Sequence, residues 1–187
     1  MISLLVPKEN EPDKNLKLDI EEELQRLMDT YGNDVLRTSY MYLKDKQKAE
    51  DAFQEVFIRV FKKYGSFRGE SSEKTWIIKI AINVCKDILR SSWVKRVFLS
   101  DKVVSQKKST GFEDGIARKD ENRLLFNEVM SLQPMYKEVI ILFYYQNFGT
   151  VEISSILNIA EGTVRSRLHR AREILKNKLV MINKIEF

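Results

Sequence analysis

The sequence predicts an all-α protein: two small helical domains joined by a flexible linker, the C-terminal domain with a helix-turn-helix. Three observations support this fold class. The 187 residues include only 7 Gly and 3 Pro, too few chain-turning residues for a many-stranded β protein. Apolar residues recur at spacings of three and four, the period of amphipathic helices. One internal stretch, about 92–118, lacks this period and divides the helical runs into two groups.

The first group of helices is expected in a domain spanning residues 19–92, after a polar, proline-containing arm over 1–18. Within this domain, apolar spacing predicts three helices, over about 20–36, 47–64 and 73–91. A short loop that begins near Gly65 separates the second helix from the third. Ser71 or Ser72 provides an N-cap for the third helix.

The linker is expected over residues 93–118, which are rich in Ser and Lys, and the second domain over 119–187. Helical pattern resumes near Asn122, and Pro134 fits the first turn of another helix. The remaining pattern predicts a short helix, a turn and a long basic helix, over about 150–157, 158–162 and 162–180.

Composition excludes several classes of site. Cys85 is the single cysteine and His169 the single histidine, so neither an internal disulfide nor a usual structural zinc site can form. We expect no metal and no cofactor. The N-terminus lacks the basic start and long apolar core of a signal peptide, and no apolar run approaches about 20 residues, the length of a membrane span. These features predict a cytoplasmic protein without membrane insertion.

The last helix has the pattern of a DNA-recognition helix. On a helical wheel its apolar residues form one stripe that is expected to pack inward, made of Val164, Leu168, Ala171 and Leu175. The opposite side carries Arg165, Ser166, His169 and Arg170, and the flanks carry Arg167 and Arg172. Outward side chains of such a helix can enter the major groove, and flanking arginines can reach phosphates.

Positive charge is concentrated in this helix. From Val164 to Lys178 there are six basic residues and one acidic residue, in a chain whose net charge is only +5. A solvated basic face on an ordinary core helix is the alternative interpretation. The preceding short helix and Gly-containing turn favour DNA binding.

Three runs resemble the extracytoplasmic-function (ECF) sigma factors of the sigma-70 family. Glu161-Gly-Thr-Val-Arg-Ser-Arg-Leu-His-Arg-Ala-Arg172 is similar to the family's −35-reading helix, E-G-T-V-K/R-S-R-L-x-R-A-R. Asp51-Ala-Phe-Gln-Glu-Val-Phe-Ile-Arg-Val-Phe61 is similar to its polymerase-binding helix, D-x-x-Q-E-x-F-x-x-x-[FY]. Phe67-Arg-Gly-Glu-Ser-Ser-Glu-Lys-Thr-Trp-Ile-Ile-Lys-Ile-Ala-Ile-Asn83 is similar to its −10-reading motif, F-R-G-[DE]-S-x-x-x-T-W-L-x-R-I-A-x-N. The resemblance covers about 20–91 and 120–180.

The resemblance implies roles for individual residues. The interface with the polymerase β′ coiled coil would use Asp51, Gln54, Glu55 and Phe57. A pocket for a flipped −10 base would use Asn83 with the loop residues Phe67, Arg68, Ser71 and Ser72. Base edges of the −35 element would face Arg165, Ser166, His169 and Arg170. Separately, helical spacing places three cations on one face, where they suit promoter-strand phosphates: Lys79, Lys86 and Arg90.

Some positions depart from the family pattern. Ala160 stands where the family has a Ser or Thr helix cap, so this turn is expected to depend on other contacts. The usual cap of the preceding helix is replaced by Gly149 or displaced to Thr150, and Val151 replaces an acid. Because His169 occupies a variable position, the resemblance does not fix the −35 sequence.

The resemblance implies an alternative sigma factor that binds RNA polymerase core through its β′ and β subunits, recognises −35 and −10 promoter elements and promotes strand opening. It also implies an anti-sigma partner, often membrane-anchored. No nucleotide-binding loop is present to couple ATP hydrolysis, so opening would depend on captured bases. A polymerase-independent helix-turn-helix regulator would explain the last helix only. An enzyme is disfavoured because no catalytic motif appears, and a purely structural helical protein leaves the basic face unexplained.

Overall fold

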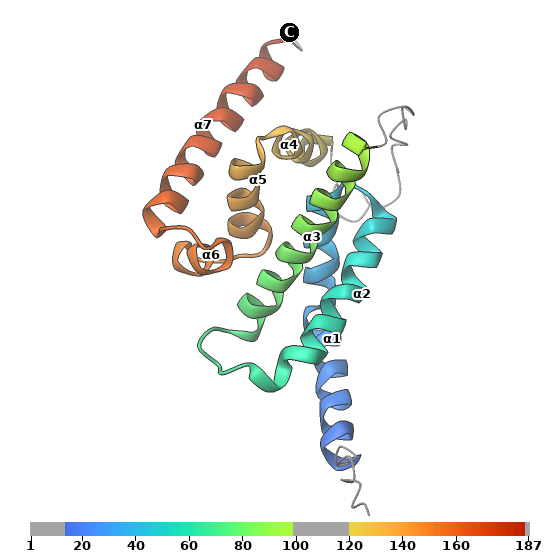
Figure 1. Cartoon of the computed structure of the whole chain (residues 1–187). Helices are drawn as coiled ribbons and strands as arrows, with labels where there is room; N and C mark the ends of the chain where they lie inside the picture. The colour runs from blue at the N-terminus through green and yellow to red at the C-terminus, as the bar shows by residue number, and fades with distance from the viewer. Residues whose placement is uncertain (1–13, 99–119, 186–187) are drawn as a thin grey trace, which may run out of the picture.

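The computed structural model describes residues 14–98 and 120–185, and every regular element within these ranges is a helix (Figure 1). The all-α prediction is therefore confirmed. Residues 1–13, most of the predicted arm, and 99–118, most of the predicted linker, lie outside the described ranges. Among the described helices none is long and apolar enough to cross a membrane.

Three long helices lie side by side in the N-terminal part: α1 (Lys14–Leu43), α2 (Lys46–Lys63) and α3 (Glu73–Phe98). A tight turn joins α1 to α2, in which Lys44 adopts a positive φ of 55° and Asp45 caps α2 by accepting a hydrogen bond from the Lys48 amide at 3.2 Å. Inward-facing residues of all three helices form the core, including Leu27, Val35, Met41, Val56, Val60, Ile77, Ile78 and Ile82.

Three helices are longer than the sequence predicts. Helix α1 begins at Lys14, inside the predicted arm, and ends at Leu43, past the predicted end near residue 36. Helix α3 continues to Phe98, inside the predicted linker, and α7 continues to Ile185. The sequence contains no Gly or Pro between Gly69 and Gly111, so nothing in the chain forces α3 to end near Ser91. Loss of amphipathic period marks where a helix leaves the core, and the helix itself can extend further.

The C-terminal part consists of α4 (Asp120–Ser131), α5 (Pro134–Ile140), a π-helical turn η3 (Ile141–Tyr145), α6 (Thr150–Leu157) and α7 (Glu161–Ile185). Pro134 occupies the first turn of α5, as predicted. In η3 the Gln146 amide bonds to the Ile141 carbonyl at 3.1 Å, the i to i+5 pattern of a π-helix. This wider turn ends α5 and directs the chain into the helix-turn-helix.

The turn of the helix-turn-helix differs in detail from the prediction. Asn158 adopts the left-handed conformation, with φ 54°, and ends α6. Helix α7 already begins at Glu161, so Gly162 lies in its first turn and not in the reversal. Because Ala160 provides no side-chain cap, the Thr150 hydroxyl contributes a contact between the two helices by donating to the Glu161 carboxylate at 2.6 Å.

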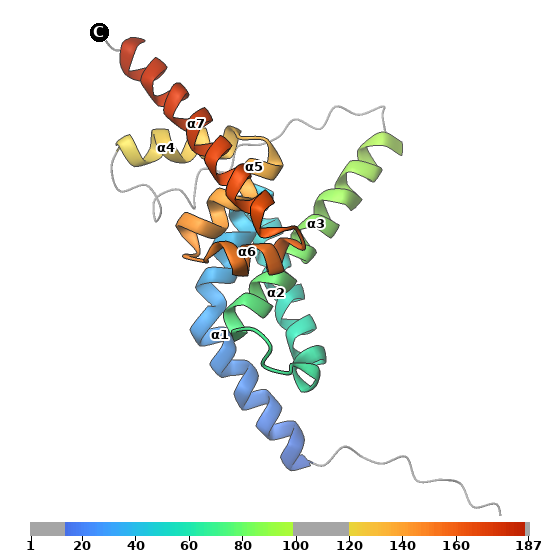
Figure 2. The same cartoon turned by 90° about the vertical axis from the view of Figure 1, so that its left-hand side faces the viewer.

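The two helical domains pack against each other through α3 and α6, as the rotated view shows (Figure 2). Lys74 at the start of α3 forms an ion pair with Asp34 at 2.9 Å and donates to the Gln146 carbonyl at 3.1 Å. The Thr75 hydroxyl donates to Glu152 of α6 at 3.1 Å. These contacts place the helix-turn-helix next to the loop that precedes α3.

Candidate nucleic-acid and protein-binding surfaces

The long basic helix α7 is oriented as its wheel predicts. Its apolar stripe is buried, with Val164 and Ala171 fully inaccessible and Leu168 and Leu175 nearly so. The side chains of the opposite side are exposed, namely those of Arg165, Ser166, His169 and Arg170. Helix α7 therefore presents an unobstructed row of hydrogen-bond donors, in the position that a recognition helix needs.

Acidic residues of α7 hold this row in place. Arg165 pairs with Glu161 at 2.8 Å, and Arg170 pairs with Glu173 at 3.1 Å. The hydrogen bond from Thr150, with that from Arg165, keeps the pKa of Glu161 below its ordinary value. Exposed pairs of this kind are weak and can exchange for contacts with phosphates or base edges.

The two flanking arginines are not equivalent. Arg167 is half-buried. Arg172 donates a hydrogen bond to the Tyr144 hydroxyl at 2.9 Å, and its guanidinium lies 5.2 Å from the ring centre of Phe143 and 5.6 Å from that of Tyr144. Arg172 is nevertheless exposed, so its predicted contact with DNA phosphates stays a prediction, one that would compete with these aromatic contacts. Nothing in the sequence pattern predicts these aromatic partners from η3.

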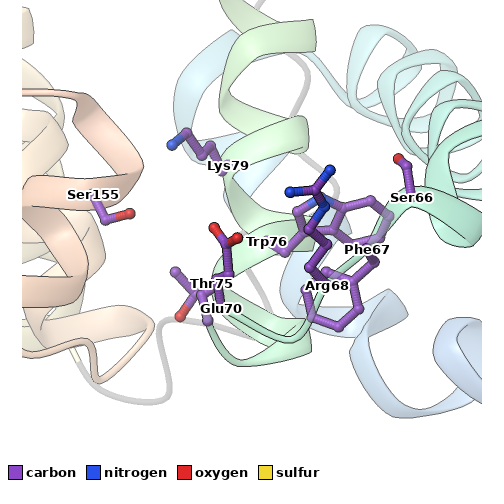
Figure 3. Close-up of a pocket in the computed structure, with 9 residues that line it drawn as sticks. Ser66, Phe67, Arg68, Glu70, Thr75, Trp76, Lys79 and Ser155 are labelled. Atoms are coloured by element: carbon purple, nitrogen blue, oxygen red, sulfur yellow. The ribbon is translucent and has the colours of Figure 1, made fainter.

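A polar cavity of about 430 Å³ lies at the loop before α3 (Figure 3). It is open to solvent, and the helix-turn-helix contributes one wall through Ser155 of α6, which lies across the cavity from the loop. The rings of Phe67 and Trp76 pack together with centres 5.0 Å apart. The other lining residues are Ser66, Arg68, Glu70, Ser71, Thr75 and Lys79. Rings beside cations and hydroxyls make a suitable environment for a nucleotide base and its phosphate.

Three of the predicted −10 residues, Phe67, Arg68 and Ser71, line this cavity, whereas Ser72 and Asn83 do not. Ser72 is exposed, and its hydroxyl oxygen caps α3 by accepting from the Thr75 amide at 3.1 Å. Asn83 is exposed on α3, one helical turn beyond Lys79. A strand would therefore have to extend along α3 to meet both the cavity and Asn83.

The predicted phosphate-contacting cations follow α3 beyond the cavity. Lys79 lines the cavity itself, and the Arg90 side chain is 76% exposed. Lys86 instead forms an ion pair with Glu138 of α5 at 3.1 Å. In this arrangement the second domain already supplies a carboxylate where the sequence analysis expected a phosphate.

The predicted polymerase-binding surface on α2 needs one correction. Asp51 and Gln54 are exposed, and Glu55 is half-buried and paired with Arg59 at 2.7 Å. Phe57 is only 4% exposed and packs 4.9 Å from the ring of Phe53, so its predicted place in an interface was wrong. Its position belongs to the buried side of α2, together with Val56 and Val60.

Two apolar side chains of α2 were missed. Ile58 is 47% and Phe61 38% exposed, unusual values for large apolar residues on a helix of a small domain. With Asp51 and Gln54 they follow the spacing i, i+3, i+7 and i+10, which is one face of a helix. We call these residues the α2 face: Asp51, Gln54, Ile58 and Phe61. Helical spacing counted from Asp51 would have identified it.

A second, apolar groove of about 530 Å³ lies in the C-terminal domain, lined by residues of α4, α5, η3 and α7. Its floor is made by Val129, Ile140 and Leu175, and Arg172 and Lys176 stand among its lining residues. Leu125 and Val180 at the same groove are 38% and 45% exposed. The sequence does not predict this groove, because its lining residues come from four separate elements, α4, α5, η3 and α7. Among the described residues no group of three or more His, Cys, Asp or Glu could hold a metal ion.

Two sequence-family models match the chain. The one described as Sigma-70 region 2 matches residues 27–94, and the one described as Sigma-70, region 4 matches residues 123–175. The first match contains the α2 face and all the lining residues of the cavity except Ser155, and the second contains Ser155 and the helix-turn-helix.

Curated relatives extend along most of the chain. ECF RNA polymerase sigma factor SigX of Bacillus subtilis is 31% identical over 171 residues, covering 87% of this chain and 87% of that protein. SigW of the same organism is 28% identical, covering 89% and 94%. The ECF RNA polymerase sigma-E factor of Escherichia coli K12 is 35% identical, covering 69% and 72%.

Two solved structures have a similar fold. The sigma factor RpoE in complex with the anti-sigma factor NepR, from Bartonella quintana, matches with a TM-score of 0.70 and 22% identity, covering 86% of this chain and 96% of that one. CnrH in complex with the cytosolic domain of CnrY matches with a TM-score of 0.64 and 16% identity, covering 86% and 90%. At these identities the likeness supports the fold alone.

Proposed function

The chain belongs to the ECF RNA polymerase sigma factors, and on that premise we propose which of its surfaces bind polymerase and which read promoter DNA. It is an alternative sigma factor that acts in promoter recognition and has no enzymatic activity of its own. Its action belongs in the cytoplasm, where bacterial transcription takes place.

The α2 face is the proposed docking surface for polymerase core. Two exposed apolar side chains beside a carboxylate and an amide provide both buried area and charge for a basic partner helix. Glu55 borders this face and adds a second carboxylate. As the family resemblance implies, the proposed partner is the β′ subunit of the polymerase core, with the β subunit as a further contact.

The cavity at Phe67 and Trp76 is the proposed receptor for an unpaired base of the −10 element. Extruding a base from duplex DNA costs a few kcal/mol, so stacking on aromatic rings has to offset that cost. Lys79 and, further along α3, Arg90 are placed to accept the phosphates of the same strand. Asn83 then meets a later base of that strand.

The outward face of α7 is the proposed reader of the −35 duplex. Arg165 and Arg170 can donate to guanine, and Ser166 and His169 can adapt to either base type. The observation that carries the whole proposal is that one chain presents both surfaces, an aromatic cavity suited to a single strand and a basic helix suited to duplex. A regulator that reads only duplex operator needs no such cavity.

An anti-sigma protein is the proposed regulator, because the structure of similar fold from Bartonella quintana contains such a partner. It would cover the α2 face or the apolar groove of the C-terminal domain. Membrane anchoring of that partner fits the family and is part of the proposal.

Polymerase binding is tested by charge reversal on the α2 face. We expect the double variant Asp51→Lys, Glu55→Lys to lose capture by immobilised core enzyme, because it sets like charges against a basic partner. The matched control reverses two exposed acids of α1, Glu21→Lys and Asp29→Lys, and is expected to bind as the wild type does. Wild-type protein that fails to bind core, or equal binding by both double variants, would contradict the proposal.

A further inference from the structure

The loop that lines the cavity is fastened at both ends to one arginine of α1. Tyr64, in the 3-10 turn η1 (Tyr64–Ser66), precedes the loop, and Glu73, the first residue of α3, follows it. Arg26 lies on α1, outside the motif that carries the loop, and its guanidinium bonds directly to Glu73 and, through Glu23, to Tyr64. One cation therefore connects the start and the end of the loop.

The contacts have the geometry that a guanidinium favours. The Arg26 Nε donates to Glu23 Oε2 at 2.9 Å and its Nη2 to Glu23 Oε1 at 2.6 Å, a bidentate pair. The same Nη2 also lies 2.6 Å from Glu73 Oε1. Tyr64 donates to Glu23 Oε1 at 2.5 Å, and Tyr31 donates to Glu73 Oε2 at 3.2 Å. Lysine, with a point charge in place of a planar fork, cannot make this set of bonds.

The charges in this cluster are strongly coupled. Hydrogen bonds lower the pKa of the Glu23 carboxylate to about 2; the bond from Arg26 has the largest effect and the bond from Tyr64 the next largest. An isolated exposed ion pair contributes little to stability, but bidentate pairs organised into a network are the exception. Here the network joins α1, η1 and α3.

Three packed aromatic rings connect the Arg26 contacts to the cavity. The Tyr64 ring centre lies 6.4 Å from that of Phe67 and 6.3 Å from that of Trp76, and Phe67 and Trp76 line the cavity. Gly69, with φ +70°, gives the loop a reversal that it must hold when a base enters. Fixing the backbone of one residue costs about 1–2 kcal/mol, so a loop already held in place binds a base more tightly than a loose one.

We propose that Arg26 is a positioning residue for promoter opening, which holds the loop from Tyr64 to Glu73 in its base-receiving form without touching DNA. The inference rests on the proposed function of the cavity and adds a residue that the −10 motif does not contain. Loss of Arg26 is expected to leave both the α2 face and α7 unchanged, because no hydrogen bond or ion pair found among the described residues joins the cluster to either surface.

The test compares Arg26→Ala, Arg26→Lys and the control Lys46→Ala, which removes one exposed α2 pair with Glu50. Each full-length variant is assembled with core enzyme. The probe is the fluorescein-labelled non-template −10 strand of a promoter mapped with the wild-type holoenzyme. Core affinity, the melting temperature and hydrogen exchange of the loop amides are measured on the same proteins.

We expect Arg26→Ala to weaken strand binding by about tenfold, the effect of losing one charge-assisted bond network worth about 1.4 kcal/mol. Loop amides 65–72 are expected to exchange faster, core affinity to stay unchanged, and Arg26→Lys to fall between the alanine variant and the wild type. If Arg26→Ala binds the −10 strand as tightly as the wild type does, the inference about Arg26 is overturned while the proposed function stands. The same holds for a parallel loss of core binding and melting temperature, which indicates general destabilisation. Failure of the wild-type holoenzyme to bind any promoter strand overturns the proposed function, and the inference with it.

Discussion

Gln146 Nε2 donates a hydrogen bond to Thr38 Oγ1 at 2.8 Å, and this bond joins the two helical domains. Both residues are inaccessible to solvent, at 1% and 0% exposure. Gln146 follows the π-helical turn η3 and also donates to the Asp34 carbonyl at 3.3 Å. A buried amide bonded to a partner domain fixes one relative placement of the two domains, because its donors have no substitute elsewhere.

Replacing this amide should loosen the domain contact. We expect Gln146→Leu, which keeps the volume and removes the donor, to lower the free energy of unfolding by about 1–3 kcal/mol because Thr38 loses its buried partner. Energy transfer between dyes on α2 and α7 should also decrease. Asn127→Leu, at an exposed site on α4, serves as the control. Unchanged stability and unchanged transfer in Gln146→Leu would show that the bond does not hold the domains together.

Substitutions at two phenylalanines of α2 should affect different properties, folding stability at Phe57 and polymerase binding at Phe61. Phe57 is buried and Phe61 exposed, so Phe57→Ala is expected to cost about 3–5 kcal/mol of folding free energy, and Phe61→Ser almost none. Phe61→Ser should instead weaken core binding, because an exposed aromatic is a typical anchor of an interface. Urea unfolding and titration of labelled core measure the two effects. If Phe61→Ser instead lowered stability and left core binding unchanged, while Phe57→Ala weakened core binding, Phe57 and not Phe61 would belong to the interface.

The arginines of α7 should differ in their salt dependence. Arg170→Ala is expected to reduce the slope of log affinity against log salt by about one for −35 duplex, because one phosphate or base contact is lost. Arg172→Ala should leave this slope unchanged and lower stability by about 0.5–1 kcal/mol through loss of its aromatic contacts. Duplex binding by the holoenzyme between low and moderate salt supplies the slopes. Equal changes of slope in both variants would mean that Arg172 contacts the DNA as Arg170 does.

Acid should remove the contribution of Glu23 to the free energy of unfolding over a defined pH range. Its folded pKa of about 2 lies below the ordinary 4.5, so the stabilisation is fully present above 4.5 and is lost as the pH falls through 2. The difference in free energy of unfolding between wild type and Glu23→Gln should therefore be constant above pH 4.5 and shrink below it. Denaturant titrations at several pH values measure this difference. A difference that does not change with pH would mean that the carboxylate is not coupled to Arg26 and Tyr64.

Sequence periodicity correctly predicted which side of a single amphipathic helix is buried and which is exposed. The stripe from Val164 to Leu175 is buried and the face with Arg165 and Arg170 is exposed, because a 3.6-residue period reports which side packs inward. The helix-turn-helix and the all-α class followed from the same signal.

Features that depend on partners distant in sequence could not be predicted this way. Arg26 and Glu73 are 47 residues apart, and nothing in either local pattern marks them as a pair. The attraction of Arg172 to Tyr144 depends on a π-helical turn that no propensity indicates. Phe57 was misassigned because a motif identifies the helix that binds, whereas burial decides which of its side chains are available.

Transcription reconstituted from core enzyme, genomic DNA and this protein tests the central claim most directly. Run-off mapping should give transcripts that start at discrete positions and share a −35 and a −10 element, only when both proteins are present. Those starts should disappear with the Asp51→Lys, Glu55→Lys variant and persist with Glu21→Lys, Asp29→Lys. No discrete starts with wild-type protein and active core, or the same starts without core, would contradict the account.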